Sequence, residues 1–262
     1  MSFTIGADIE LFAKDKTGKH VSLCGLIGGT KESPSPMKGA DHHHLMVQED
    51  NVSLEFNIPI CYTEDQLIYF LTEAESLIKK NYLEPLGFEI SDACAVMFDK
   101  DQLLHPQAIV FGCEPDYNAW KMVENKKPKC DYPQLRTAGG HIHIGCEENM
   151  VEVIRWMDFF VGVPSILWDK SPGAKLRREL YGKAGAMRPK PYGEEYRVPS
   201  NFWMFSEENI KRIYNGTAKA IKMVKRKNHL TRKEGLLIQE IINTGDEDAA
   251  KSFCDSAGIA YL

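Results

Sequence analysis

The chain lacks a long apolar run, a paired-cysteine motif and an excess of basic residues. No apolar stretch approaches the roughly 20 residues that a membrane-spanning helix needs, so we expect no membrane partner. The 262 residues include seven scattered cysteines, none in a Cys-x-x-Cys spacing. That pattern argues against a zinc ribbon or a disulfide framework and favours reduced thiols in a cytoplasm. The formal net charge of -5 provides no general attraction to nucleic acid or anionic lipid.

The sequence also shows no internal repeat, no low-complexity linker and no signal peptide at its beginning. Hydrophobic residues make up 43% of the chain, which is enough for a sizeable core. The length allows one large domain or two small ones. Because nothing resembles a linker, we predict a single domain over residues 1–262, with 206–262 as its helical C-terminal part.

Four short segments alternate strictly between apolar and polar residues: 5–12, 51–58, 140–144 and 195–198. A β-strand sends successive side chains to opposite faces, so each segment would have one apolar face and one functional face. The polar positions are Asp8, Glu10, Ser53, Glu55, Asn57, His141, His143, Glu195 and Arg197. One sheet built from these strands would present carboxylates, imidazoles and a guanidinium, which suit metal ions and phosphates.

The alternation also indicates how the strands pair. Parallel strands that are buried on both faces read as continuous apolar runs, whereas these segments alternate and are separated by irregular spacers. An antiparallel sheet with helices on one side fits better, so the predicted fold class is α+β.

Helix and loop signals fill the rest of the chain. Apolar periodicity and N-cap residues predict helices at 63–80, 148–169, 206–227, 231–243 and 246–257. Thr63 would cap the first, and Pro164 would kink or break the second. We expect strands at 19–24 and 88–98, a glycine- and arginine-rich connection at 171–193, and a loop at 25–44 that is long enough to suggest that it covers a site.

The acidic positions suggest a cation site. Asp8 and Glu10 lie on the same strand face, where carboxylates repel each other unless a cation lies between them. Hard oxygen ligands favour Mg²⁺ or Mn²⁺. Glu55, with Glu49 and Asp50 just before it, could add further oxygens. The alternative is an ordinary solvated strand face.

Two histidines in the segment 139–145 are flanked by glycines. His141 and His143 would project in parallel and could contact one ion or one polyphosphate, while the glycines would let a ligand approach the backbone closely. The alternative is a pair of hydrogen-bonded core histidines. Since no cysteine occupies a nearby ligand position, the pattern does not indicate structural zinc.

A basic cluster interleaved with glycines lies further along the chain. Arginine forks suit phosphate and carboxylate groups, and the two embedded tyrosines, Tyr181 and Tyr192, argue against the alternative of a solvated loop. The cluster comprises Arg177, Arg178, Lys183, Arg188, Lys190 and Arg197. A second basic stretch at 219–233 is expected to be a wetted helix face.

Taken in order, these pieces resemble the glutamine synthetase and glutamate–cysteine ligase superfamily, and more narrowly the phage-type COOH–NH2 ligases, or type 2 amidoligases. The resemblance covers about residues 3–205. The matching motifs are GADIE (6–10), DNVSLEFN (50–57), GCEPDYNAW (112–120), GGHIHIG (139–145), RELYGKAGAMR (178–188), YGEEYR (192–197) and SNFW (200–203). The first motif departs from the family pattern, which usually has a glutamate at the position of Asp8.

The resemblance implies a curved antiparallel sheet with helices on its convex face and with ATP and two or three divalent ions on its concave face. It assigns the metal ligands, for Mg²⁺ or Mn²⁺, to Glu10, Glu55, His141 and Glu195, with Asp8 as a further ligand or a supporting group. The nucleotide contacts would be His143, Arg177, Arg178 and Arg188. The catalytic residues would be Arg188, Arg197 and Glu55.

The implied activity is ATP-dependent ligation through an acyl phosphate. A carboxylate would attack the γ-phosphate of ATP, Mg²⁺ and arginines would neutralise the spreading charge, and an amine would trap the acyl phosphate as an amide. The substrates would be small-molecule or peptide carboxylates and amines, in the cytoplasm of the host if the protein is phage-encoded. The loop 25–44, with His42 to His44, would act as a lid against water.

Two other functions are compatible with the same residues. A guanidino-kinase-like phosphotransferase shares the sheet architecture but stops at phosphoryl transfer. The other function is that of a non-catalytic metal- or nucleotide-binding module, or of an oxygenase that uses His141, His143 and a glutamate as a facial set of metal ligands. The arginine cluster argues against an oxygenase, because oxygen chemistry has no use for it. The sequence leaves the oligomeric state open.

Overall fold

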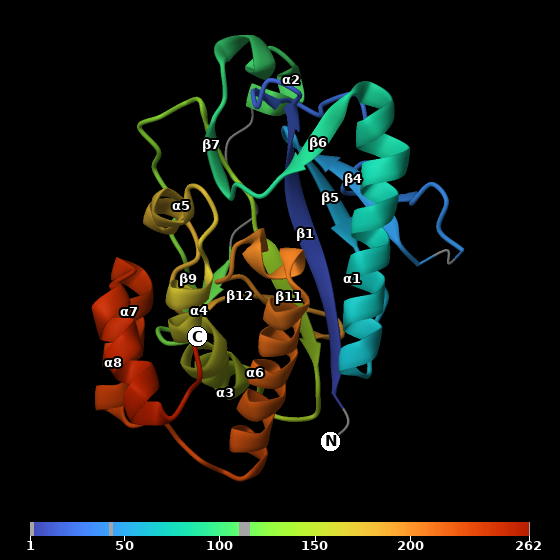
Figure 1. Cartoon of the computed structure of the whole chain (residues 1–262). Coiled ribbons are helices and arrows are strands. Elements are labelled where there is room, and N and C mark those ends of the chain that lie inside the picture. Colours follow the sequence, from blue (N-terminus) through green and yellow to red (C-terminus); the bar gives the residue numbers. More distant parts are fainter. Residues whose placement is uncertain (1–2, 42–43, 110–115, 262) are drawn as a thin grey trace.

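The structure is a computed structural model that describes residues 3–41, 44–109 and 116–261, and it has the expected α+β fold (Figure 1). The main antiparallel sheet runs in the order β3-β4-β5-β1-β11-β13-β12-β8-β9. Its strands are β1 (Thr4–Asp15), β3 (Ser35–Pro36), β4 (Met46–Asp50), β5 (Ser53–Asn57), β8 (Tyr117–Asn118), β9 (Val123–Glu124), β11 (Gly140–Gly145), β12 (Ala186–Lys190) and β13 (Gly193–Tyr196). The antiparallel pairing predicted from the alternation is therefore confirmed.

Strand β1 organises this sheet because it pairs with β5 on one side and β11 on the other. Its apolar residues, such as Ile9 and Leu11, are buried in the main core. Asp8 and Glu10 take the alternate positions, and the register sets Glu10 opposite Glu55 and Asp8 opposite His141. The far half of β1 pairs with β2 (His20–Val21) and β6 (Phe88–Ser91).

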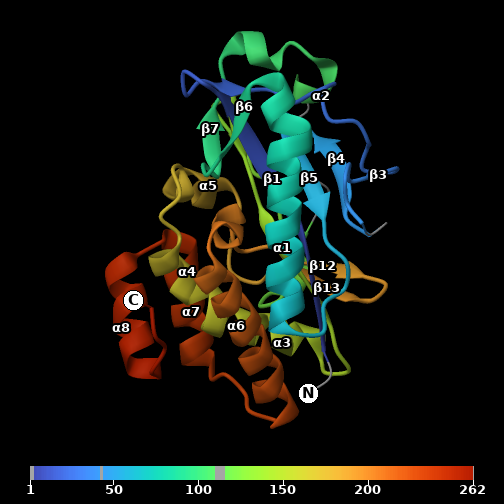
Figure 2. The ribbon, with the colours of Figure 1, turned by 45° about the vertical axis from the view of Figure 1, so that its right-hand side comes forward.

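Helices pack on the apolar face of the sheet, as expected. Figures 1 and 2 show α1 and α6 side by side against it, and both helices contribute to the main core. The helices are α1 (Glu64–Ile78), α2 (Pro106–Ile109), α3 (Met150–Met157), α4 (Val163–Trp168), α5 (Ala174–Leu180), α6 (Glu207–Lys225), α7 (Arg232–Thr244) and α8 (Glu247–Ala257). Short 3-10 turns lie at Glu84–Leu86, Lys100–Leu103 and Asn201–Phe205.

The helix boundaries follow the sequence signals closely. Thr63 caps α1 by accepting a hydrogen bond from the Gln66 N–H at 3.2 Å. A π-helical turn, Lys79–Leu83, extends α1. A second π-helical turn, Asp158–Gly162, joins α3 to α4 directly before Pro164. Proline has no N–H to donate to the preceding turn, which fits the interruption of the α-helical pattern at this point.

The prediction of one continuous strand over 88–98 was wrong. The chain forms β6 and then β7 (Ala95–Met97), and β7 pairs with β10 (Leu135–Thr137) in a separate two-stranded sheet. The break has a local cause: the Ser91 hydroxyl accepts a hydrogen bond from the Ala93 N–H at 3.2 Å, which competes with strand pairing. The Cys94 N–H then donates to the carbonyl of Pro172 at 3.0 Å.

The stretch 171–193, expected as a glycine- and arginine-rich connection, contains the regular elements α5 and β12. The helix buries Arg177 and Arg178 rather than an apolar stripe, so it carries no helical hydrophobic pattern. The strand is fixed by its partner, with Arg188 opposite Glu195.

Two further expectations concern membrane-spanning helices and the cysteines. Among the described residues, no helix combines the length and the apolar character needed to cross a bilayer. The six cysteines within the described ranges are free thiols, and Cys113 lies outside those ranges.

The close approach of β11 to the turn Asn201–Phe205 gives a test of the fold. A Cβ on Gly140 would lie 2.6 Å from both the Ser200 carbonyl oxygen and Trp203 Nε1. We therefore expect Gly140→Ala to lower the free energy of unfolding by about 1–3 kcal/mol, measured by urea denaturation. Gly6→Ala on β1 is the control, because its Cβ would meet only the His143 side chain, at 3.6 Å from Cβ and 4.0 Å from Nδ1, which is ordinary contact. Equal losses in the two variants would contradict the packing described.

Candidate active site

A cavity of about 530 Å³ opens over the polar face of the sheet, within the size range of small-molecule sites. Residues from distant parts of the chain line it, among them Glu10, Asp50, Asp116, Arg136, His141, Arg177 and Arg197. Two groups of potential metal ligands lie on this side of the sheet: Asp8, His143 and Glu195, and Glu10, Asp50 and Glu55. The structure thus brings together the four alternating segments that the sequence singled out.

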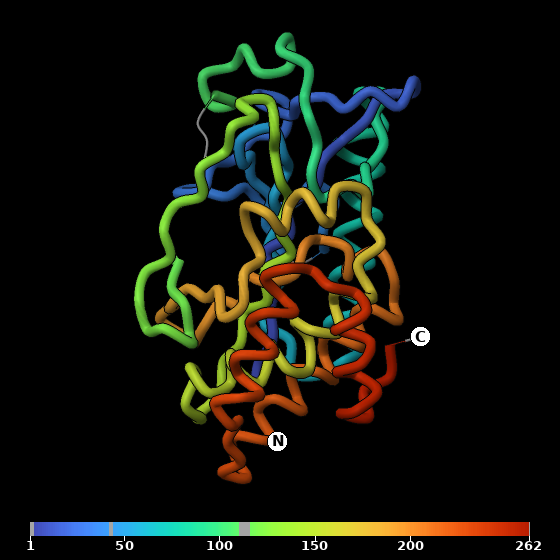
Figure 3. Tube along the Cα trace, turned by 90° about the vertical axis from the view of Figure 1, so that its left-hand side faces the viewer, coloured from blue at the N-terminus to red at the C-terminus, as the bar shows by residue number. Residues whose placement is uncertain are grey.

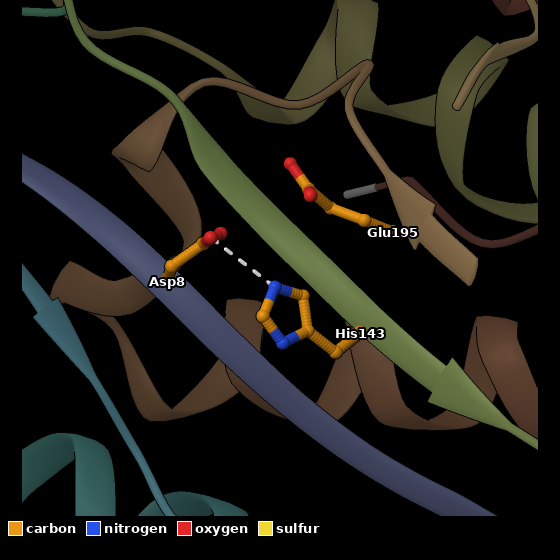
Figure 4. A group of neighbouring side chains, drawn as sticks. All are labelled: Asp8, His143 and Glu195. Carbon is orange, nitrogen blue, oxygen red and sulfur yellow. Dashed lines mark ion pairs between the residues drawn. The ribbon is translucent and has the colours of Figure 1, made fainter. Parts of the chain in front are cut away.

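The first group draws one residue from each of β1, β11 and β13 (Figure 4). Asp8, His143 and Glu195 offer one ligand atom each, all within 4.8 Å of one another. His143 Nδ1 lies 2.9 Å from the Tyr192 hydroxyl. The other nitrogen, Nε2, is buried and forms no hydrogen bond within the described part of the chain, although Asp8 Oδ2 is 3.2 Å away. A cation shared by the two atoms would satisfy both.

His141 supports this group from the neighbouring position on β11. Its Nδ1 lies 3.1 Å from Asp8 Oδ1 and 3.4 Å from Glu195 Oε1, so we assign the ring proton to Nδ1. Burial lowers the pKa of His141 to about 3, and the charge of Arg197 contributes to the same direction, so the ring is neutral at neutral pH. A Cβ on Gly139 would lie 2.5 Å from His141 Nε2, so this glycine keeps the unprotonated nitrogen accessible.

Asp8 and Glu195 are compensated by cationic groups of the protein itself. Burial acts to raise the pKa of Asp8, but the charge of His143 and the hydrogen bond from His141 outweigh it and hold this pKa well below its usual range. Glu195 is fully buried and pairs with Arg197 Nη1 and with Lys190 Nζ, the latter at 2.8 Å. Arg188 Nη1 lies 3.6 Å from the same carboxylate.

The second group, Glu10, Asp50 and Glu55, is made only of carboxylates. Burial raises the pKa of Glu10 to about 7, and the charge of Asp50 adds to the effect. Burial likewise raises the pKa of Asp50, and it raises that of Glu55 well above its usual range together with the charges of Asp8 and Glu10. Three raised pKa values in one cluster indicate that it is short of positive charge.

The donor chemistry of both groups fits divalent cations. An all-oxygen set is what Mg²⁺ prefers, and a set with one imidazole and two carboxylates also suits Mn²⁺. The grouping differs from the sequence-based assignment in two respects: His143, rather than His141, completes a cluster of ligand atoms, and Asp50 joins Glu10 and Glu55.

The two consecutive arginines of α5 point to different places. Arg177 lines the cavity and donates hydrogen bonds to the carbonyls of Val198 and Pro199 at 3.1 and 3.0 Å. Arg178 lines a separate cavity, because successive residues of a helix lie about 100° apart around its axis. The structure therefore does not bring Arg178 together with Arg177 at the cavity over β1 and β11.

Some cavity residues were not identified from the sequence. Arg136 is buried and lines the cavity, donating to Asn51 Oδ1 at 2.9 Å and to the Pro133 carbonyl at 2.8 Å. It lies at the centre of the three-residue strand β10, which is too short to show a recognisable alternation and carries no motif, so no pattern pointed to it. Lys190 was part of the basic cluster but had no assigned role; its position two residues after Arg188 on β12 was the available signal.

The loop expected to cover the site does reach the cavity. Its residues 29–32 contribute to the lining. Glu49 anchors the loop, because its carboxylate accepts hydrogen bonds from the backbone N–H groups of Gly25, Ile27 and Gly28 at 2.8–3.1 Å. His42 and His43 lie outside the described residues, and the lid function of the loop stays a prediction.

The raised pKa of Glu10 makes the stability of the metal-free protein depend on pH. Between the ordinary value of 4.5 and about 7, the folded protein retains a proton that the unfolded chain has released. The free energy of unfolding therefore falls as the pH rises through this interval. Glu10→Gln removes the titration and keeps an oxygen to accept from the Gly139 N–H, which donates to Glu10 at 2.7 Å.

We expect the Glu10→Gln variant to match the wild type at about pH 5 and to exceed its stability at about pH 8, in urea denaturation with a chelator present. Glu89→Gln on β6 is the control, because Glu89 is exposed and its loss should leave the pH profile unchanged. A variant that is less stable than the wild type at the higher pH would contradict this electrostatic description.

Comparisons with known proteins place the chain in a family. No curated protein matches the sequence. A solved structure described as "GmaS/ADP complex-Conformation 1" is similar with a TM-score of 0.35 and 12% identity, covering 97% of this chain and 68% of that chain. The family model of the phage phiEco32-like COOH.NH2 ligases, type 2, matches residues 121–254, just over half of the chain. That region includes β11, α5, β12 and β13, and on this match the chain belongs to the phage phiEco32-like COOH–NH2 ligase family, type 2.

Proposed function

We propose that the protein joins a carboxylate to an amine using ATP, through an acyl phosphate, and that the cavity over β1 and β11 is its active site. Family membership supports amide ligation in general. The observation that carries the finer proposal is the pair of ligand clusters on one side of the sheet, with Arg177 and Arg197 lining the adjacent cavity. Phosphoryl transfer needs that combination of bound cations and fixed positive charges.

The two clusters would hold divalent cations, Mg²⁺ or Mn²⁺. Glu10, Asp50 and Glu55 would bind one, and Asp8, His143 and Glu195 another, with the open nitrogen of His141 as a further candidate. When bound, such ions orient the phosphates of ATP and neutralise their charge. Because Glu10 and Glu55 carry raised pKa values, cation binding would displace protons and strengthen as the pH rises.

The arginines would act on the transferred group. Arg197 is held by the buried Glu195 and lies 3.7 Å from Asp116 through its Nε, so its guanidinium is positioned before substrates arrive. We propose that Arg197 and Arg177 stabilise the charge that spreads over the γ-phosphoryl group as the substrate carboxylate attacks phosphorus and ADP leaves.

The second half-reaction needs a proton acceptor. The attacking amine forms the amide C–N bond, phosphate leaves, and one proton is released from nitrogen. Asp116 lines the cavity outside both clusters, and Asn125 Nδ2 donates a hydrogen bond to its Oδ1 at 2.9 Å. We assign it the role of accepting that proton. Residues 29–32 of the anchored loop would exclude water, which otherwise hydrolyses an acyl phosphate.

The activity is tested by incubating the protein with ATP, Mg²⁺ and pools of carboxylates and amines, with ADP release and product mass as readouts. The proposal predicts amide, ADP and phosphate only when both a carboxylate and an amine are present. A phosphorylated guanidino product without an amide would instead establish a phosphotransferase. Nucleotide binding without any turnover would establish a non-catalytic module.

Arg197 offers a sharper test of the mechanism. Lysine keeps the charge but loses the planar fork that pairs with a phosphoryl group, so Arg197→Lys should lower kcat by about 100-fold or more. Arg212→Lys is the control, since Arg212 pairs with Glu208 on α6, away from the cavity. A kcat near the wild-type value in a folded Arg197→Lys protein would exclude this role.

A further inference from the structure

A second cavity of about 940 Å³ lies beside α5. The Cα trace in Figure 3 shows this helix close to the junction of α7 and α8. Arg178 contributes to the cavity from α5, Lys183 from the following loop, and Gly245 from the end of α7. It is separate from the cavity over β1 and β11, because the two have no lining residue in common.

Arg178 is buried here without the partners that a buried charge requires. Only 8% of the surface of Arg178 is exposed. Within the described part of the chain, its guanidinium forms no hydrogen bond and no ion pair, and Nη1 is fully buried. Its neighbour Arg177, by contrast, is bonded to two carbonyls. An unpaired buried charge is costly to folding, so its presence indicates a partner outside the chain.

Three acidic residues line the cavity, Asp169, Glu179 and Glu247, against the four basic residues Lys170, Lys175, Arg178 and Lys183. Glu247 pairs with Lys170 at 3.3 Å and with Lys175 at 3.5 Å. Asp169 accepts hydrogen bonds from the Ser200 hydroxyl at 2.7 Å and from the Ser171 N–H at 3.1 Å. The charges of Asp169 and Glu179 act on Arg178 and Lys183 respectively, but within the described part of the chain no carboxylate forms an ion pair with either cation. The lining therefore holds one more basic than acidic residue.

Lys183 adds to this unbalanced positive charge. Its Nζ donates to the Asn243 carbonyl at 3.4 Å, a neutral acceptor. Burial lowers the pKa of Lys183, and the charge of Arg178 lowers it further, so the two cations are close enough to repel each other. An anion bound between them would relieve this repulsion and supply acceptors for both.

We propose that this second cavity binds a small anionic molecule through Arg178 and Lys183, and that the recognised group is a carboxylate or a phosphate. A guanidinium fork binds either group in a bidentate manner. The cavity is larger than one such group, so the ligand carries a body of several further atoms. The inference rests on the second cavity alone and does not depend on the proposed ligase reaction.

The test measures binding of inorganic phosphate and of glutarate to the full chain by isothermal titration calorimetry. We expect at least one of the two anions to bind, and the one that does identifies the recognised group. Arg178→Met should weaken that binding by at least about tenfold, the worth of hydrogen bonds to a charged group, with a smaller loss in Lys183→Met. Because Arg178→Met removes an unpaired buried charge, the variant should be at least as stable as the wild type.

Two comparison variants locate the bound anion. Arg226→Met changes an exposed arginine at the end of α6 and should not alter the affinity. Arg197→Lys changes the other cavity and should leave it unchanged as well. The proposal is overturned if neither anion binds, if Arg178→Met retains wild-type affinity, or if the loss appears in Arg197→Lys instead.

Discussion

Mutual repulsion between buried carboxylates is the constraint on which this site depends. Strands β1, β4, β5 and β13 bring acidic side chains to one face of the sheet, where low hydration strengthens every charge interaction. The charge of His143 offsets the negative charge of Asp8, and the charges of Arg197 and Lys190 offset that of Glu195. Glu10, Asp50 and Glu55 keep raised pKa values. A cluster of this kind is tolerated in a folded protein when cations bind to it, and binding cations is what chemistry on ATP requires.

The glycines of β11 show how the core supports this arrangement. Gly140 lets the strand approach the turn at Asn201–Phe205, where the Trp203 indole donates to the Gly140 carbonyl at 3.0 Å. Gly139 leaves space beside His141 Nε2. On β13, the Tyr196 hydroxyl donates to the buried Asp158 at 2.8 Å, which ties the strand of Glu195 to the helical layer. The positions of the reactive groups therefore depend on packing behind the sheet.

Alternation in the sequence was sufficient to predict the strands, their functional faces and the α+β class, because a period of two is a local property of the chain. The division of the metal ligands into two clusters was not predictable, because it depends on the register between strands. The pairing sets His143 opposite Glu195, and a shift by one residue would send every side chain of the strand to the other face. The cavity that Arg178 faces was not predictable either. Its helix carries no apolar stripe, so the sequence does not indicate which way each side chain of the helix points. Arg136 lies in the three-residue strand β10, which is too short for its alternation to be recognised in the sequence.

The central claim is that these carboxylates and histidines hold divalent cations beside the arginine-lined cavity. Anomalous diffraction from crystals grown with Mn²⁺ and a non-hydrolysable ATP analogue tests it most directly, because the metal positions appear without reference to activity. The account predicts Mn²⁺ among Glu10, Asp50 and Glu55 and among Asp8, His143 and Glu195, with the analogue's phosphates between the ions and Arg197. Mn²⁺ bound away from both clusters, with the analogue ordered elsewhere, would contradict it.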